Sequence, residues 1–345
     1  MMKYLKILNI IDIPWSSAAA DYALSQSKAL SDCGHKIFFA APKNSFSFKS
    51  AQLCGYKTIH FSDRKRILMP QDIFSVSSFC RKEKIDIINA HTGRTMTAAA
   101  AVKVFTPSTI TVRTKADAKK PSVGFISKSA SLIICGSKHI EKMYSDKSSG
   151  LNLKTIYKGF SDLKNSPLSP APPYKIGLLG RLDPVKGHSI LIDAAIKLLK
   201  KGKECLFYFA GEEANIRWND LKKLIPSQYA DKFKYLGKVN DPYAFTQSCH
   251  IGVIPSISSE AVSRAALEWI SSARTLICSD VGSLPEYTQL IFKNSDSSDL
   301  ADKMEKILDF EKIKKISQEN YEKAQKEFSF MKFKEETEKA FLGLV

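Results

Sequence analysis

Short apolar runs alternate along the chain with segments of helical periodicity, and small or polar residues join one to the next. Residues 6–11 form such a run, followed by a helical segment through about residue 33 and a second run at 36–41. Runs of this length between turn residues are typical of buried parallel strands. The repeated order strand, loop, helix predicts an α/β protein with functional residues at the carboxyl ends of the strands. Further strands are expected at 85–90, 109–113, 132–135, 154–157, 174–179, 206–210, 234–236, 251–254 and 275–278.

Two domains are expected from the length of 345 residues, because each half can bury a core of its own. The proline-rich sequence SPLSPAPP at residues 166–173 reads as a linker between them. We therefore predict a first domain of residues 1–165, a second of residues 166–328, and a last helix within residues 329–345.

The segment from Pro255 to Glu286 carries the most informative pattern. Ser258 or Ser259 is expected to cap a helix that starts near Ala261, with Glu260 at its mouth and Glu268 eight residues further on. On a helix that spacing turns roughly 80° past two full turns and advances about 12 Å. Carboxylates so far apart do not act on one bond, but they could bind the two ends of a long, hydroxyl-rich ligand.

The same helix start offers free amides and a partial positive charge, which suit a phosphate. The ligand so implied is a nucleotide sugar. The simpler alternative is that Glu268 lies on a solvated helix face and Glu260 is an acid of the cap region. The residues whose amides or side chains would line this donor site are Ser259, Ala261, Val262 and Ser263.

Upstream, Gly180-Arg181-Leu182 and Lys186-Gly187 flank a strand-to-helix loop. Arg181 supplies a planar fork and Lys186 a point charge, which together suit a diphosphate. No Asp-x-Asp pair stands at a strand end, so these cations are expected to do the work of a metal ion, and we predict no metal site. A structural salt bridge is the competing interpretation.

The ordered set of Gly180-Arg181-Leu182, Lys186-Gly187, Ala210-Gly211, Leu236-Gly237, Pro255-Ser256 with Glu260 and Glu268, and Asp280-Val281-Gly282 with Pro285-Glu286 resembles the retaining GT-B glycosyltransferases of family 4 (glycosyl transferases group 1). The resemblance is closest over residues 175–290. It implies two Rossmann-like domains with parallel sheets facing across a cleft, the donor held by the second and the acceptor by the first. It also implies that the helix in 329–345 crosses back to the first domain.

The resemblance also implies roles for single residues. Glu260 would bind hydroxyls of the donor sugar and Glu268 the ribose, while Arg181 and Lys186 would stabilise the leaving diphosphate. His91, at the end of the 85–90 strand, is similar to the family's interdomain histidine that contacts the donor sugar. Taken alone, a single histidine is more often a satisfied structural residue. His91, Arg181, Lys186 and Glu260 are thus the catalytic candidates, and further donor contacts are expected from Gly180, Gly211, Lys238 and Val239.

Acceptor contacts are expected in the first domain. The loop after the first strand has Ser16 and Ser17 where the family usually carries glycines, so a glycine-specific backbone angle is missing there. Arg94, after His91, and the pair Arg113 and Lys115 are further acceptor candidates, although an ordinary surface loop explains the last two equally well.

Positive charge is concentrated in the first half. The chain has a net charge of +17, of which residues 1–170 carry 26 − 11 = +15 and residues 171–345 carry 26 − 24 = +2. This indicates an anionic membrane surface, an anionic acceptor or nucleic acid as partner, or a lysine-rich solubilising surface. Aromatic residues do not interleave with the lysines, so we expect no nucleic acid. Arg64 to Met69 mixes cations with apolar residues and could enter a membrane interface; a basic loop is the simpler interpretation.

No apolar run reaches the roughly 18–20 residues of a membrane span, and no signal peptide is expected. The seven cysteines are scattered without a Cys-x-x-Cys pair, as in a reducing cytosol. We therefore expect a cytoplasmic protein, peripheral on the inner face of the cytoplasmic membrane if the basic surface binds lipid.

The function predicted is a retaining, metal-independent transfer of a sugar from a nucleoside-diphosphate sugar to a hydroxyl of a glycan or glycolipid, in synthesis of lipopolysaccharide, capsule or another cell-envelope glycan. The nucleotide sugar is a co-substrate, and no cofactor is expected. A non-catalytic nucleotide-sugar-binding protein is the alternative, and a basic nucleic-acid-binding protein a weaker one.

Overall fold

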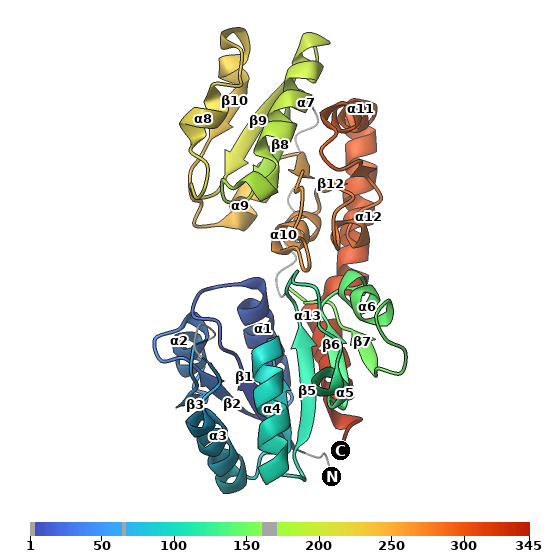
Figure 1. Ribbon diagram of the computed structural model, residues 1–345. Helices are drawn as coiled ribbons and strands as arrows, with labels where there is room; N and C mark the ends of the chain where they lie inside the picture. Colours follow the sequence, from blue (N-terminus) through green and yellow to red (C-terminus); the bar gives the residue numbers. More distant parts are fainter. Residues whose placement is uncertain (1–3, 64–66, 161–170) are drawn as a thin grey trace. The chain divides into compact units, whose positions relative to one another are not determined.

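The computed structural model describes residues 4–63, 67–160 and 171–345, and the chain divides into two compact units. The first unit contains residues 1–159 and 329–345, and the second contains residues 160–328. Each unit is a parallel sheet with helices on both faces (Figure 1). The predicted α/β class with two parallel sheets is confirmed.

The sheet of the first unit has the strand order β3-β2-β1-β4-β5-β6-β7. The order reverses between β1 and β4, and in such sheets ligands usually bind at the carboxyl ends of the strands where the order reverses. The strands are β1 (Lys6–Ile10), β2 (Lys36–Ala41), β3 (Lys57–His60), β4 (Ile87–Ala90), β5 (Ile110–Lys115), β6 (Leu132–Cys135) and β7 (Leu153–Thr155). The helices are α1 (Ala18–Asp32), α2 (Phe46–Leu53), α3 (Pro70–Glu83), α4 (Gly93–Phe105), α5 (Phe125–Lys128), α6 (Lys138–Ser145) and α13 (Phe330–Leu342).

Alternate residues of β1 face opposite sides of this sheet, as the two-residue period of a strand requires. Leu8 and Ile10 join an apolar cluster with residues of α3 and α4. Asn9 points to the other face, where its side-chain amide reaches Ser27 of α1. On that face α13 packs beside α1, and the rings of Tyr22 and Phe333 meet edge to face with centroids 5.5 Å apart.

The second unit repeats the arrangement with the order β10-β9-β8-β11-β12-β13, which reverses between β8 and β11. Its strands are β8 (Tyr174–Leu179), β9 (Cys205–Ala210), β10 (Phe233–Tyr235), β11 (Ile251–Ile254), β12 (Thr275–Ser279) and β13 (Ile291–Phe292). Its helices are α7 (His188–Lys200), α8 (Trp218–Lys222), α9 (Pro242–Gln247), α10 (Arg264–Ser271), α11 (Ser297–Ile307) and α12 (Phe310–Phe328).

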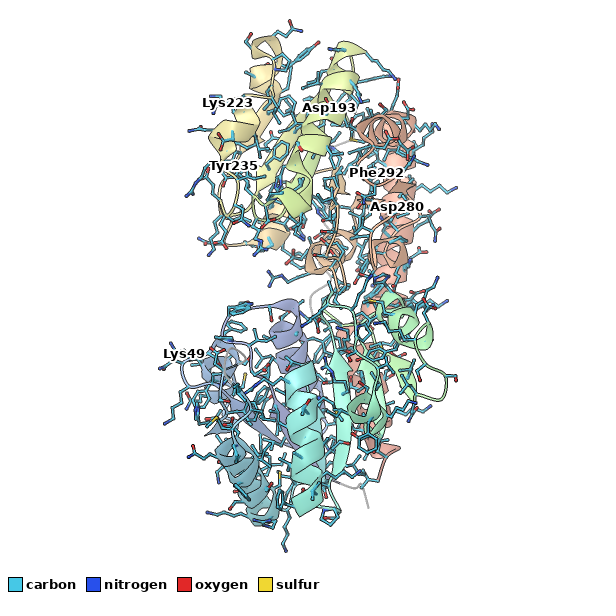
Figure 2. The ribbon with its side chains drawn as sticks, viewed as in Figure 1. Lys49, Asp193, Lys223, Tyr235, Asp280 and Phe292 are labelled. Atoms are coloured by element: carbon cyan, nitrogen blue, oxygen red, sulfur yellow. The ribbon has the colours of Figure 1, made fainter. Side chains whose placement is uncertain are left out.

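Two strand glycines determine how closely α10 packs on this sheet. A Cβ at Gly252 of β11 would lie 2.2 Å from the Trp269 ring, and one at Gly177 of β8 would lie 2.8 Å from it. Trp269 is fully buried, so only glycine leaves room for α10 above these two strands. The opposite face is filled by apolar side chains of α7 and α11, and Phe292 is buried among them (Figure 2).

The sequence did not predict α2 and β3. The strand β3 is short, lies at an edge of the sheet and buries none of its four residues fully, so its apolar pattern is weak. Of the predicted linker, residues 166–170 lie outside the described residues, and residues 171–173 form bends.

Candidate functional site

In the second unit, the loops after β8 and β11 pack closely against each other at Gly187. Its φ is +67°, and a Cβ there would lie 1.9 Å from the carbonyl oxygen of Pro255. The Ile257 amide donates to the carbonyl of Val185 at 2.9 Å. These contacts place Lys186, which precedes the glycine, against the segment that carries Glu260.

Lys186 and Glu260 form the central ion pair of this loop cluster. Lys186 Nζ donates to Glu260 Oε1 at 2.5 Å, and Ser256 Oγ donates to the same oxygen at 2.7 Å. Ser279 Oγ in turn donates to the carbonyl of Ser256 at 2.5 Å. Glu260 is 5% exposed. Its carboxylate is therefore held at one position by residues from the ends of β8, β11 and β12.

Arg181 is the exposed cation of the same loop. Its Nη2 lies 3.4 Å from Asp183 Oδ2, and its side chain is 58% exposed. Asp183 is buried, and its other oxygen accepts from the Val185 amide at 3.1 Å. The guanidinium is thus oriented by one carboxylate while it remains open to solvent, as the binding of an anionic ligand requires.

The predicted start of the helix near Ala261 is wrong. The helix α10 begins at Arg264, and its N-cap is Ser263, whose Oγ accepts from the Ala266 amide at 3.4 Å. The carbonyl of Glu260 instead accepts from the Ser283 amide at 2.8 Å, and Ser259 has a φ of +66°. Tertiary bonds therefore hold Ser259, Glu260, Ala261 and Val262 in a loop, and helical arithmetic does not apply to the spacing of Glu260 and Glu268.

Glu268 itself lies on α10, in the second turn of the helix. Its Oε1 is 3.9 Å from Arg264 Nε, and its side chain is 20% exposed. The neighbouring Trp269 anchors this helix to the sheet, so Glu268 projects from a rigid element.

Gly211 joins the loops after β9 and β10 to the loop after β8. Its amide donates to the carbonyl of Gly237 at 2.8 Å, its φ is +153°, and a Cβ there would lie 2.0 Å from the carbonyl oxygen of Gly180. Tyr235 Oη donates to the Gly211 carbonyl at 2.8 Å. Beyond this junction Lys238 is exposed and pairs with Glu212 at 3.3 Å, and Val239 is partly exposed.

In the first unit, His91 is buried at the end of β4. Its Nε2 lies 3.0 Å from Asn9 Oδ1, and the Asn9 oxygen also accepts from Asn89 Nδ2 at 3.0 Å. Burial, together with the charge of Arg113, lowers the pKa of His91 to about 3. The imidazole is therefore neutral at physiological pH.

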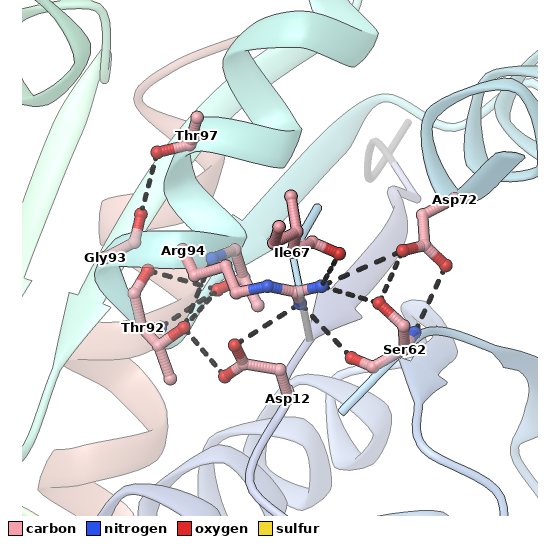
Figure 3. Close-up of polar contacts among 9 residues, drawn as sticks. Asp12, Ser62, Ile67, Asp72, Thr92, Gly93, Arg94 and Thr97 are labelled. Atoms are coloured by element: carbon pink, nitrogen blue, oxygen red, sulfur yellow. Dashed lines mark hydrogen bonds and ion pairs between the residues drawn. The ribbon is translucent and has the colours of Figure 1, made fainter. Parts of the chain in front are cut away.

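Arg94 is enclosed by carboxylates at the start of α4 (Figure 3). Its guanidinium lies 3.5 Å from Asp12 Oδ2 and 3.8 Å from Asp72 Oδ2, and its Nη1 donates to the Ser62 carbonyl at 3.2 Å. Thr92 Oγ1 donates to Asp12 Oδ1 at 2.8 Å. This cluster joins the segments after β1, β3 and β4. Sequence analysis singled out Arg94 but not Asp12, Ser62 or Asp72, because the partners are distant in the chain.

Arg113 and Lys115 are buried, and the predicted basic loop there is part of β5. Arg113 donates to the Ala90 carbonyl at 2.9 Å and to the Thr114 carbonyl, while Lys115 Nζ donates to Asp117 Oδ1 at 2.8 Å. Burial lowers the pKa of both side chains. Of the two interpretations left open for these residues, the surface loop is therefore wrong, because β5 continues through Lys115.

Ser16 is exposed, and the hydroxyl of Ser17 caps α1 by accepting from the Ala20 amide at 3.2 Å. Arg64 to Arg66 lie outside the described residues, and Ile67 and Met69 beyond them are exposed.

Over the residues that the structure describes, no three His, Cys, Asp or Glu side chains gather as metal ligands do. The same part of the chain contains no helix of the length and apolarity that crossing a membrane demands.

Two parallel sheets of this topology define the fold of the GT-B glycosyltransferases, and solved structures share it over nearly the whole chain. A glycosyltransferase from Rickettsia africae superposes with a TM-score of 0.84, covers 99% of both chains and is 16% identical. The Anabaena protein HepE, in complex with UDP and glucose, has a TM-score of 0.76, is 18% identical, and the match covers 98% of this chain and 100% of HepE. The lipopolysaccharide outer core galactosyltransferase WaaB has a TM-score of 0.78, is 14% identical, and the match covers 99% and 100% of the two chains.

At the level of sequence, residues 173–309 match the family Glycosyl transferases group 1. A curated relative, an uncharacterized glycosyltransferase from Methanocaldococcus jannaschii, is 27% identical over 212 residues. That match covers 58% of this chain and 56% of the relative, so the chain spans little more than half of the relative's length. The resemblance to group 1 glycosyltransferases inferred from the sequence is confirmed.

Proposed function

We propose that the protein transfers a sugar from a nucleoside-diphosphate sugar to an acceptor hydroxyl, with retention of anomeric configuration. The observation that carries this proposal is the convergence of Arg181, Lys186 and Glu260 at the carboxyl edge of one parallel sheet. The edge where strand order reverses is the usual ligand site of such sheets. HepE, which shares the fold, has UDP and glucose in its complex.

The leaving diphosphate is the group that needs most stabilisation in this reaction. Arg181 and Lys186 carry the opposite charge, and the first amides of α10, from Arg264 onward, have no partner within the helix. Oriented donors of this kind are worth roughly 3–4 kcal/mol each in a transition state. In this proposal they do the work that a divalent ion does in other enzymes, so no metal and no cofactor is needed.

Recognition of the donor sugar would fall to one oxygen of Glu260. Lys186 and Ser256 occupy Oε1, whereas Oε2 makes no hydrogen bond within the described residues. A fixed carboxylate with one free oxygen suits a sugar hydroxyl. Glu268, held on α10, is proposed to bind the ribose diol of the nucleotide, and Lys238 with Val239 to border the base.

We propose front-face attack, in which the leaving phosphate helps to take the proton of the acceptor hydroxyl. No side chain is assigned the part of a covalent nucleophile. His91, at the end of β4 in the first unit, is proposed to contact a sugar substrate. The role of acceptor residue remains with Ser16, which is exposed. Arg94, Arg113 and Lys115 are bound within the unit and would act by shaping it.

For the acceptor we propose a glycan or glycolipid of the cell envelope. The first half of the chain carries 26 basic and 11 acidic residues, which favours an anionic acceptor or an anionic membrane surface. WaaB, which shares the fold, is a lipopolysaccharide galactosyltransferase. Co-sedimentation with vesicles that contain anionic lipid, compared with neutral vesicles, tests the membrane part of this proposal.

The direct test is an assay of transfer and hydrolysis over a panel of UDP-, GDP- and ADP-hexoses. The double variant Arg181→Ala/Lys186→Ala should lose activity at least 100-fold while it remains folded by circular dichroism. The matched control is Arg217→Ala/Lys223→Ala, which removes the same two residue types from exposed surface pairs of the same unit. A protein that binds a nucleotide sugar but neither transfers nor hydrolyses it would instead be a non-catalytic binder.

A further inference from the structure

A chain of buried hydrogen-bonded side chains in the first unit ends on His91. Its other members are Asn9 on β1, Ser27 on α1 and Asn89 on β4, and all four residues are at most 1% exposed. Asn9 is the branching point, because its amide group contacts each of the other three.

Donor and acceptor rules fix the orientation of the Asn9 amide. Ser27 has one hydroxyl proton and donates it to the Ala23 carbonyl at 2.7 Å. The Asn9 atom 3.0 Å from Ser27 Oγ must therefore be the amide nitrogen, since the serine oxygen can now only accept. The amide oxygen of Asn9 consequently faces His91.

The contacts of Asn89 agree with this orientation. Its amide nitrogen lies 3.0 Å from Asn9 Oδ1 and 2.8 Å from Gln26 Oε1. Thr114 Oγ1 lies 2.8 Å from Asn89 Oδ1 and 3.2 Å from Gln26 Oε1, with one proton for the two oxygens. Ser27 is therefore the anchor that directs the oxygen of Asn9 at His91.

An amide oxygen can only accept, so His91 must donate through Nε2. The low pKa of His91 keeps the ring neutral, which means that Nδ1 carries a lone pair and no proton. Within the described part of the chain, Nδ1 has no hydrogen-bond partner. Nδ1 is not among the unpartnered polar atoms that the protein encloses, so a donor from a bound molecule can reach its lone pair.

We infer that Asn9 is a positioning residue that holds His91 as the neutral Nε2–H tautomer and so presents Nδ1 as an acceptor for a sugar hydroxyl. The identity of the ligand rests on the proposed function, whereas the tautomer does not. In this arrangement His91 neither carries a positive charge nor donates to the substrate.

The tautomer can be measured in the full-length wild-type protein labelled with 15N-histidine. Six histidines are present, and the His91 signals are those lost in His91→Gln. At pH 7 we expect Nε2 in the protonated and Nδ1 in the unprotonated range of 15N shifts. A protonated Nδ1, with either a neutral or a cationic ring, would overturn the inference.

Variants of Asn9 separate positioning from general packing. Asn9→Leu removes the acceptor, so His91 should become a mixture of its Nε2–H and Nδ1–H tautomers. The value of kcat/KM should fall at least 10-fold. Asn9→Asp keeps an acceptor-only oxygen and should restore the wild-type tautomer and part of the rate. The matched control Thr114→Val removes a network member that does not touch His91, and should leave the tautomer unchanged. An unaltered His91 tautomer in Asn9→Leu would contradict the role of Asn9. If that variant does not fold, the wild-type spectrum still shows whether Nε2 or Nδ1 of His91 carries the proton, and a protonated Nδ1 overturns the inference.

Addition of UDP-, GDP- and ADP-hexoses, and of methyl glycosides as acceptor analogues, tests the ligand. A compound that donates a hydrogen bond to His91 should move the Nδ1 resonance. A shift caused by a nucleotide hexose identifies the donor sugar as the partner of His91, and a shift caused by a methyl glycoside identifies the acceptor. A nucleotide sugar that is turned over, in the presence of a working acceptor, without moving Nδ1 would overturn the contact while the proposed function stands. If no compound binds or reacts, the proposed function fails, and the wild-type spectrum remains the test of Asn9.

Discussion

Lys186 Nζ and Glu260 Oε1 lie 2.5 Å apart although 74 residues separate them in the chain. Lys186 lies in the loop after β8 and Glu260 in the loop after β11. These are the two strands between which the order of the second sheet reverses. The two charges to which we assign a role in ligand binding are thus also bonded to each other within the protein. Substitutions here should alter both stability and activity.

Lys186→Ala should lower the free energy of unfolding by about 1–3 kcal/mol, because it leaves the buried Glu260 carboxylate without its charged partner. Glu260→Gln should cost less, since the amide oxygen still accepts from Ser256. Urea denaturation of the wild type and both variants measures the difference. Equal free energies of unfolding in all three proteins would show that the ion pair does not contribute to stability.

Gly282→Ala should be strongly destabilising and should abolish donor binding. The φ of Gly282 is +59°, and a Cβ would lie 1.8 Å from the Glu260 carbonyl oxygen, so the loop that carries Glu260 must shift. The matched control is Gly202→Ala, whose φ is +72° but whose Cβ would meet no atom within 4 Å. The control should cost about 1 kcal/mol, the usual penalty of a left-handed residue without a clash. Thermal unfolding and nucleotide titration of the two variants give the comparison, and similar losses in both would refute the contact.

Arg94→Ala should destabilise the first unit by about 3 kcal/mol, because the buried carboxylates of Asp12 and Asp72 would lose their cation. If Arg94 instead served only as a contact for the acceptor, KM would rise while stability changed by no more than about 0.5 kcal/mol. Unfolding in urea together with acceptor kinetics distinguishes the two roles. Lys57→Ala, which breaks an exposed pair with Glu83 in the same unit, provides the control.

Stability should fall as the pH is lowered from 6.5 towards 4. Burial lowers the pKa of His91 to about 3 and that of His188 to about 4, whereas an unperturbed histidine titrates near 6.5. Below pH 6.5 the unfolded chain therefore binds protons at both residues that the folded chain does not bind, so the stabilisation is complete above pH 6.5 and is lost below it.

The histidine contribution can be isolated with His188→Phe. Each histidine should contribute about 1.4 kcal/mol per pH unit in this window. The loss of unfolding free energy between pH 7 and pH 5 should thus be about 2 kcal/mol smaller in the variant than in the wild type. An identical pH dependence in the two proteins would mean that His188 titrates normally in the folded state.

Most strands were predictable because they are apolar runs that end at small or polar residues. The edge strand β3 was not, because none of its residues is fully buried and its apolar pattern is weak. The start of α10 was not predictable, because Ser258, Ser259 and Ser263 are equally good caps. The choice is made by the contacts of Glu260 with Lys186 and Ser283, which are distant in sequence.

The surroundings of His91 show the same limit. Its position after a strand indicated a functional residue, but the hydrogen bonds that fix its protonation come from β1, α1, β4 and β5. Likewise Arg94 was visible as a cation near a strand end, whereas Asp12 and Asp72 became its partners only through the fold. Local sequence identifies which residues can do chemistry, and long-range contacts decide which of them are free to do it.

The most direct measurement is a calorimetric titration of UDP-, GDP- and ADP-hexoses into the wild-type protein and into Glu268→Ala. The control is Asp220→Ala, which removes an exposed acid from the same unit. The account predicts that one nucleotide sugar binds the wild type with a stoichiometry of one. Its affinity should fall about 10-fold or more in Glu268→Ala and change little in Asp220→Ala. Absence of binding by every nucleotide sugar, or equal affinity in the wild type and Glu268→Ala, would contradict it.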